Sequence, residues 1–111
     1  MIEVRRYRQA NGSEPLTDWL KRLPDRQAKA RLFARIDRLE GGNFGDCKFL
    51  RGGVFELRID WGPGYRVYFG RDGALLVILL CAGDKRRQSA DIERAVQFWN
   101  DYKSRSVSDE R

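Results

Sequence analysis

The sequence contains no histidine, and this absence restricts its chemistry more than any other feature of its composition. Histidine is the side chain that most often transfers protons near neutral pH, and it is the commonest metal ligand. A catalytic imidazole and a histidine-based metal site are therefore excluded. The two cysteines, Cys47 and Cys81, cannot supply the four ligands of a zinc site by themselves. We therefore expect no metal and no small-molecule cofactor.

Cysteine is rare and the apolar runs are short. Cys81 lies in an apolar run and Cys47 in a glycine-rich loop, so two reduced thiols are expected, with a disulfide between them as the alternative.

The apolar run at residues 74–82 has about half the length that a transmembrane helix needs. The N-terminal residues MIEVRRYRQ lack the apolar core of a signal peptide. These features predict a cytoplasmic protein with no membrane partner.

What the sequence has in excess is positive charge. It contains 22 Lys and Arg against 16 Asp and Glu, which gives the 111 residues a net charge of +6. This excess favours a polyanionic partner, either nucleic acid or an acidic protein. A basic domain without such a partner is the alternative, because charge alone does not decide between them.

Hydrophobic periodicity predicts one α+β domain with the element order β-α-α-β-β-β-α. The predicted elements are a strand at 2–8, helices that begin after residues 13 and 24, a hairpin at 54–69, a strand at 74–82 and a helix at 89–103. We expect a mainly antiparallel sheet with helices packed on it, and the apolar strand 74–82 inside the sheet. The domain is expected to span residues 1–103, and the polar residues 104–111 are expected to form a disordered tail.

The predicted hairpin is expected to bury one face and to expose the other. Apolar residues alternate with polar ones on both sides of its turn. If Trp61 faces Tyr65 across three loop residues, Asp60 lies opposite Arg66 and can form a surface ion pair with it. Phosphate binding by Arg66 is a second interpretation that is compatible with this pair. The residues predicted on the exposed face are Glu56, Arg58, Asp60, Arg66 and Tyr68.

Two further groups of basic residues are candidates for binding anions. Residues 85–87 (KRR) follow the apolar strand directly, so the rigid end of that strand is expected to position their charges. Arg31, Arg35 and Arg38 recur at spacings of four and three on the second predicted helix. This stripe indicates either a solvated helix face or a docking surface for phosphate or for an acidic partner.

Two segments and the order of the elements resemble a known group of proteins. ELRIDWGPGYRVYF at residues 56–69 and LLCAGDKRRQSADIERA at residues 79–95 resemble the RelE/ParE superfamily of bacterial toxins. The resemblance is to its HigB-like or phage Gp49-like branch, whose members are often labelled addiction module killer proteins. The most specific matches are Tyr65-Arg66-Val67 and Gly83-Asp84-Lys85 followed by Asp91-Ile92.

The resemblance implies the toxin of a type II toxin–antitoxin system. Many members cleave messenger RNA in the ribosomal A site, so a metal-independent endoribonuclease (an mRNA interferase) that inhibits translation is the leading hypothesis. The ParE branch inhibits DNA gyrase, and a gyrase inhibitor without nuclease activity is the alternative. An inactive member that serves operon control is a third hypothesis. The implied partners are the ribosome, mRNA and a cognate helix-turn-helix antitoxin.

The resemblance also implies roles for individual residues. Arg66 matches a phosphate-binding arginine of the ribonuclease members, and Lys85 lies near a cationic residue that they keep after the following strand. Glu56 takes the place of a lysine, and its carboxylate could act as a base. We therefore predict the catalytic residues Arg66, Lys85, Arg58 and Glu56, and the RNA-binding residues Arg86, Arg87, Tyr68, Arg31, Arg35 and Arg38.

Overall fold

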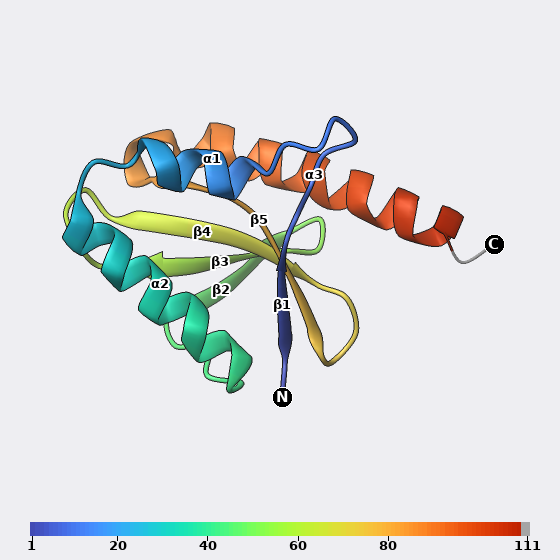
Figure 1. Ribbon diagram of the computed structural model, residues 1–111, viewed down its shortest axis with the longest axis horizontal. Helices are drawn as coiled ribbons and strands as arrows, with labels where there is room; N and C mark the ends of the chain where they lie inside the picture. Colours follow the sequence, from blue (N-terminus) through green and yellow to red (C-terminus); the bar gives the residue numbers. More distant parts are fainter. Residues whose placement is uncertain (110–111) are drawn as a thin grey trace.

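The computed structural model describes residues 1–109, and the side chains of residues 1–106. Figure 1 shows one twisted sheet with helices packed on it. The α+β class and the mainly antiparallel sheet are therefore confirmed. The elements are β1 (Glu3–Arg6), α1 (Pro15–Arg22), α2 (Arg26–Glu40), β2 (Cys47–Arg51), β3 (Val54–Ile59), β4 (Tyr65–Arg71), β5 (Leu76–Asp84), the short 3-10 helix η1 (Lys85–Arg87) and α3 (Gln88–Asp109).

The five strands lie in the order β1-β5-β4-β3-β2. β1 pairs with β5 in parallel, and all other neighbours are antiparallel. β5 lies between β1 and β4, and its residues 77–83 are all buried. The prediction that the apolar run lies inside the sheet is confirmed for residues 76–82, whereas Ala74 and Leu75 precede the strand and are exposed. A strand that is covered on both faces is apolar throughout, without alternation.

The predicted element order is wrong in one place, because it omits β2. The observed order is β-α-α-β-β-β-β-α, with β2 paired to β3 at the edge of the sheet. Lys48 and Phe49 of β2 are exposed, so this strand lacks the alternation by which a half-buried strand is detected in a sequence. Gly52 and Gly53 connect β2 to β3 with φ angles of 60° and 83°, a conformation that favours glycine.

The helices cover opposite faces of the sheet. Leu16 of α1 and Leu32 of α2 belong to an apolar core on one face. The N-terminus of α2 is fixed by Asp25, whose carboxylate accepts hydrogen bonds from the backbone N–H groups of Gln27 and Ala28. On the other face, Trp99 of α3 belongs to a second apolar core with residues of β3, β4 and β5.

α3 approaches the sheet closely at two glycines within strands, and also at Gly53 in the turn between β2 and β3, where a Cβ atom would overlap Trp99. A Cβ atom at Gly70 of β4 would overlap the indole ring of Trp99, and a Cβ atom at Gly83 of β5 would overlap the carboxylate of Asp91. Neither of these two strand glycines has a positive φ angle, so space and not backbone conformation accounts for both.

α3 is longer than the predicted helix at 89–103. It continues to Asp109, so residues 104–109 of the expected tail are helical, and residues 110–111 lie outside the described residues. The domain boundary at residue 103 stays a prediction. Cys47 and Cys81 are both free, as expected, and burial raises the pKa of Cys81 to about 12. Within the part of the chain that the structure describes, no helix is long and apolar enough to cross a membrane.

Candidate functional site

The connection between β3 and β4 forms a wall of a cleft at one end of the sheet, at the left in Figure 1. Gly62 and Gly64 reverse the chain there with φ angles of 55° and 83°. The cleft has a volume of about 480 Å³. We call it the loop cleft, and its residues are Asp46, Arg58, Asp60, Gly62, Pro63, Gly64, Arg66 and Lys85.

The predicted alignment of the hairpin is wrong by two residues. Ile59 pairs with Tyr65, and Arg58 lies opposite Arg66 where Asp60 was expected. The reason is the length of the connection, which spans residues 60–64 and is longer than the expected three residues. A shift of two residues keeps each side chain on its predicted face but changes its cross-strand partner. Arg66 accordingly pairs with Glu56, with 3.7 Å between Nε and Oε1.

Part of the hairpin face that was expected in solvent is covered by α3. Glu56 is 1% exposed and Tyr68 is fully buried. The expectation that both side chains face solvent is therefore wrong, and the Tyr68 ring has no surface on which an RNA base could stack. Alternation separates the two faces of a strand, but it does not reveal whether a distant helix covers the polar one.

Beneath the first turn of α3 lies a buried polar cluster of Glu56, Arg66, Tyr68, Gln88 and Asp91. The amide nitrogen Nε2 of Gln88 donates a hydrogen bond of 2.6 Å to Oε2 of Glu56. Three polar atoms of the cluster are buried without a hydrogen-bond partner among the described residues: Arg66 Nε, the Tyr68 hydroxyl and Asp91 Oδ2. Arg66 Nε still faces the Glu56 carboxylate, but the Tyr68 hydroxyl and Asp91 Oδ2 have no such partner. An unsatisfied buried polar atom costs about 1–3 kcal/mol, so this grouping is unusual for a structural core.

The cluster shifts the protonation equilibria of two of its members. Burial, with the nearby carboxylates of Glu56 and Asp91, raises the pKa of Tyr68, which keeps its hydroxyl neutral. Burial also raises the pKa of Asp91, although the guanidinium groups of Arg94 and Arg87 act in the opposite direction. Perturbed pKa values of this kind are common at functional sites.

Two cations reach the loop cleft beside Arg66. Arg58 is held by Asp46, with 2.7 Å between Nη2 and Oδ1. Lys85 is exposed, and its ammonium group has no ion pair or hydrogen bond among the described residues. The backbone N–H of Lys85 donates a 2.8 Å hydrogen bond to the carbonyl of Gly64, which fixes η1 against the hairpin connection.

Arg86 and Arg87 turn away from the loop cleft. Both line a different cleft, between the end of α1 and the start of α3. Arg86 is held by Asp84, whose carboxylate accepts hydrogen bonds from its backbone N–H and its guanidinium, each at 2.9 Å. The structure thus divides the predicted basic run between two clefts.

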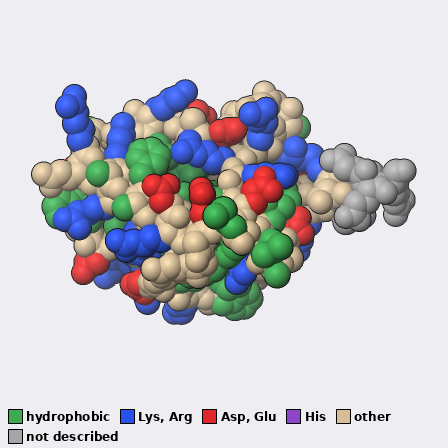
Figure 2. Space-filling view, turned by 60° about the horizontal axis from the view of Figure 1, so that its bottom comes forward, with side chains coloured by type: hydrophobic (Ala, Val, Ile, Leu, Met, Phe, Trp, Pro, Cys, Tyr) green, Lys and Arg blue, Asp and Glu red, His purple; other side chains and the backbone are tan. Residues whose placement is uncertain are grey.

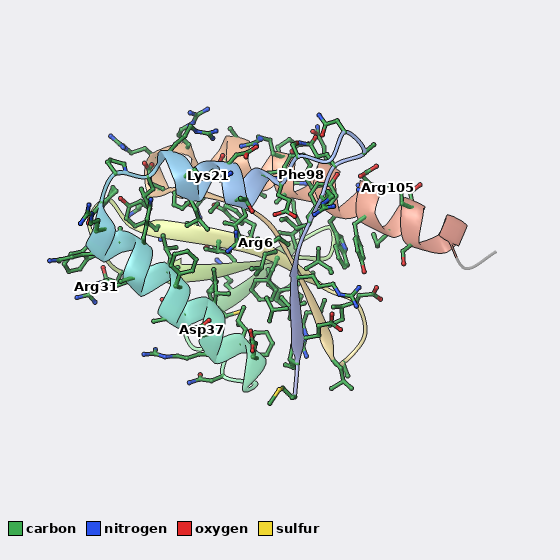
Figure 3. All side chains as sticks on the ribbon, in the orientation of Figure 1. Arg6, Lys21, Arg31, Asp37, Phe98 and Arg105 are labelled. Atoms are coloured by element: carbon green, nitrogen blue, oxygen red, sulfur yellow. The ribbon has the colours of Figure 1, made fainter. Side chains whose placement is uncertain are left out.

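The arginine stripe of α2 borders the loop cleft but is partly engaged in structural contacts. Arg35 donates hydrogen bonds to the carbonyls of Phe44, Asp46 and Arg58, at 2.5–3.3 Å. Arg31, labelled in Figure 3 near the start of α2, lies with its guanidinium carbon 3.9 Å from the centre of the Trp61 ring. Together with Arg38, these arginines line a groove of about 500 Å³ that shares Asp60 with the loop cleft.

On the face that Figure 2 shows, the basic side chains are unevenly distributed. In Figure 2, Lys and Arg side chains spread along the left and upper parts of the molecule, and apolar side chains gather at the lower right. In the orientation of Figure 1, the left end carries the hairpin connection and the turn between α1 and α2. The cationic clefts therefore lie at one end of the fold.

A comparison with protein families identifies the group to which the chain is related. The model of the family described as "Phage derived protein Gp49-like" matches residues 18–98, which is most of the chain. The chain belongs to the Gp49-like family. A Haemophilus influenzae protein described as "Uncharacterized protein" is 56% identical over 77 residues, which cover 69% of this chain and 78% of that protein.

The Gp49-like family is associated with the toxins of toxin–antitoxin systems, and this association suggests an antitoxin as a partner. The matched residues include the whole loop cleft and the whole buried polar cluster. Both features therefore lie within the part of the chain that the Gp49-like family shares.

Three residues of this region were not assigned a role from the sequence: Asp46, Gln88 and Asp91. Asp91 was named only as part of a motif that resembles the RelE/ParE superfamily. The signal that could have identified it is Gly83, because a glycine inside an apolar strand often marks a close approach by another segment. No three acidic, cysteine or histidine side chains among the described residues are arranged to hold a metal ion.

Proposed function

We propose that this Gp49-like protein is the toxin of a type II toxin–antitoxin system in the RelE/ParE superfamily. We further propose that it cleaves mRNA on the ribosome and is neutralised by a helix-turn-helix antitoxin. The observation that carries the proposal is the convergence of Arg58, Arg66 and Lys85 on one cleft. Fixed positive charges in a cleft of this kind suit the binding of an RNA phosphate.

The proposed reaction requires stabilisation of negative charge more than it requires a particular proton acceptor. The 2′-oxygen of a nucleotide attacks the adjacent phosphorus and loses its proton, while the bond to the 5′-oxygen breaks and that oxygen gains a proton. Charge accumulates on the non-bridging oxygens in between. Guanidinium groups stay charged throughout and can stabilise this charge without titrating. Since the chain has no imidazole, we expect the ribosome to align the substrate for cleavage.

Arg66 and Glu56 have distinct roles in this proposal. The Arg66 side chain is 13% exposed, so it lines the loop cleft while its Nε faces the buried carboxylate of Glu56. Glu56 in turn is held by Gln88. We assign Glu56 to positioning Arg66 and no longer to proton transfer, because a 1% exposed carboxylate does not face the cleft. Pre-oriented charge is what makes such a site effective.

The proposal is tested by inducing the chain in cells without antitoxin and mapping the 5′ ends of cellular RNA. New 5′ ends inside translated messages are expected, with free RNA spared. Normal translation together with failing DNA supercoiling would contradict the ribonuclease function and support the gyrase alternative. Growth without defect at full expression would favour an inactive member.

The residue test is Arg66→Ala, combined with Glu56→Gln. Removing Arg66 alone leaves a buried carboxylate, and breaking a buried ion pair costs about 3–5 kcal/mol. The double variant removes both charges and should keep the fold. Loss of one charged transition-state contact is expected to reduce the cleavage rate on the order of 10²–10³-fold. Arg51→Ala is the matched control, because Arg51 is exposed on β2 and pairs with Glu93 away from the cleft. A folded double variant that cleaves like the control would remove Arg66 from the site.

A further inference from the structure

A second basic cleft lies between the end of α1 and the start of α3. Its volume is about 500 Å³, comparable to that of the loop cleft. η1 contributes Lys85 to the loop cleft and Arg86 and Arg87 to this second one, which we call the helix cleft. The two clefts therefore meet at one short turn of the chain.

The helix cleft contains more positive charge than its carboxylates neutralise. Arg86 is paired with Asp84 at 2.9 Å, and Arg94 lies 3.6 Å from Asp91. The remaining arginines, Arg22 and Arg87, are exposed and form no ion pair or hydrogen bond within the described part of the chain. Two guanidinium groups are thus available to a ligand.

The helix cleft also has an apolar part. Trp19 is half-buried and packs edge-on against Tyr65, with 5.8 Å between ring centres. Leu23, Pro24 and Ala82 complete the apolar lining. An indole beside two unpaired guanidinium groups combines a stacking surface with phosphate donors, which is the combination used to bind single-stranded nucleic acid.

We propose that the helix cleft binds a nucleotide of single-stranded RNA next to the phosphate held in the loop cleft. Arg22 and Arg87 contact the phosphate of that nucleotide, and its base packs against Trp19. The inference rests on the proposed function, because it assumes that RNA occupies the loop cleft. RNA is favoured over an acidic peptide because the cleft offers an aromatic surface as well as charge, and because η1 joins it to the loop cleft.

The test measures RNA affinity by fluorescence anisotropy over a range of salt concentrations. The probes are 2′-O-methyl RNA oligonucleotides of mixed sequence, which lack the attacking hydroxyl: a dinucleotide, and a strand of about ten nucleotides. The variants are Arg22→Ala and Arg87→Ala, with Arg51→Ala as the control for loss of one exposed positive charge. Melting curves check that each variant is folded.

The expected result is a loss that depends on strand length. For the long strand, each variant should bind several-fold more weakly, and the slope of log affinity against log salt should fall by about 0.7 per lost phosphate contact. Binding of the dinucleotide, which fits the loop cleft alone, should match the control. Equal losses for both lengths would overturn the inference, because they would indicate a general electrostatic effect.

Two further outcomes separate this inference from the proposed function. If Lys85→Ala weakens both probes while Arg22→Ala and Arg87→Ala behave like the control, the inference fails and the proposed function stands. If the unaltered protein binds neither probe, the inference fails, whereas the proposed function is decided by the 5′ ends mapped in cells. Variants that keep RNA affinity but lose co-purification with the antitoxin would assign the helix cleft to that protein, and would also overturn the inference.

Discussion

Two parts of α3, its first turn at Asp91 and its middle at Trp99, rest on the sheet in the same way but among different neighbours. Trp99 lies against Gly70, and Asp91 lies against Gly83, each so close that a Cβ atom would not fit. Around Trp99 the contacts are apolar, with residues such as Val54. Around Asp91 lies the polar cluster with its three buried atoms that lack a hydrogen bond among the described residues. One close approach therefore stabilises the fold, and the other places polar groups beside the cleft.

This difference indicates a division of tasks along one helix. The apolar middle of α3 supplies the burial that holds the helix on the sheet. Its polar first turn retains groups that cost stability, which is expected where a site is built and not where a core is packed. Substitutions at these two places should therefore change the stability by different amounts and, for some residues, in opposite directions.

Gly70→Ala is expected to have the largest effect on stability. Its Cβ atom would overlap several atoms of the Trp99 ring, which is rigid and buried, so the helix or the strand has to move. Overpacking of this kind costs about 1–3 kcal/mol, and 1 kcal/mol corresponds to about 4–8 °C in Tm for a domain near this size. Thermal unfolding followed by circular dichroism measures it. Gly41→Ala is the control, because Gly41 has ordinary space around it. Equal Tm values for the two variants would show that Trp99 adjusts freely.

Gly83→Ala is expected to destabilise the protein less. The added Cβ atom would overlap the carboxylate of Asp91, which lies at the end of a side chain and can rotate more readily than an indole. Combining Gly83→Ala with Asp91→Ala should recover part of the loss, since the second change removes the obstacle. The double-mutant cycle should give a coupling on the order of 0.5–3 kcal/mol in urea unfolding. Additive effects would mean that the two residues do not compete for space.

The sequence predicts the apolar parts of this fold better than the polar ones. Strand β5 and helix α2 were predicted because a long apolar run and a capped periodic stripe depend on local residues alone. β2 was missed because it is a short edge strand with exposed Lys48 and Phe49. The length of the hairpin connection, and with it the partner of Arg66, depends on strand pairing that alternation does not specify.

The candidate site was predicted in part. Arg58, Arg66 and Lys85 were predicted to act together, and they line one cleft. Glu56 and Tyr68 were expected in solvent, because nothing local to the hairpin reveals that α3 covers them. Burial by an element far along the chain is a tertiary property, so polar residues on a strand are the ones most easily misassigned.

Tyr68→Phe is expected to stabilise the protein slightly. The Tyr68 hydroxyl is buried without a hydrogen bond, so its removal relieves the cost of burying an unsatisfied polar group and leaves the ring in place. Tyr7→Phe is the control at the middle of α3, where the Tyr7 hydroxyl donates a 2.5 Å hydrogen bond to Asp101. That variant should lose stability by about 1 kcal/mol. A loss of stability in Tyr68→Phe would show that its hydroxyl has a partner in solution.

The smallest expected effect is the pH dependence of Asp91→Asn. Burial raises the pKa of Asp91 in the folded protein above the ordinary value of about 3.9, so folding favours its protonated form. Below the ordinary value both states are protonated, and the carboxyl has no electrostatic cost. As the pH rises through the raised pKa, the protein loses stability relative to Asp91→Asn, because the charged form is buried. The free energy of unfolding of Asp91→Asn should therefore exceed that of the wild type by a growing amount as the pH increases, and should still exceed it at neutral pH.

Asp84→Asn is the matched comparison, because its stability relative to the wild type should change with pH in the opposite direction. Hydrogen bonds from Arg86 lower the pKa of Asp84, so its stabilising contribution is present above the ordinary value and is lost as the pH falls through the lowered one. Urea midpoints measured across the acidic range and at neutral pH test both signs. Asp37→Asn, exposed on α2 (Figure 3), controls for the loss of one negative charge. If Asp91→Asn and Asp84→Asn shift the midpoint in the same direction, the carboxylate of Asp91 is not desolvated in the folded protein, and the contrast between the first turn and the middle of α3 does not extend to charge.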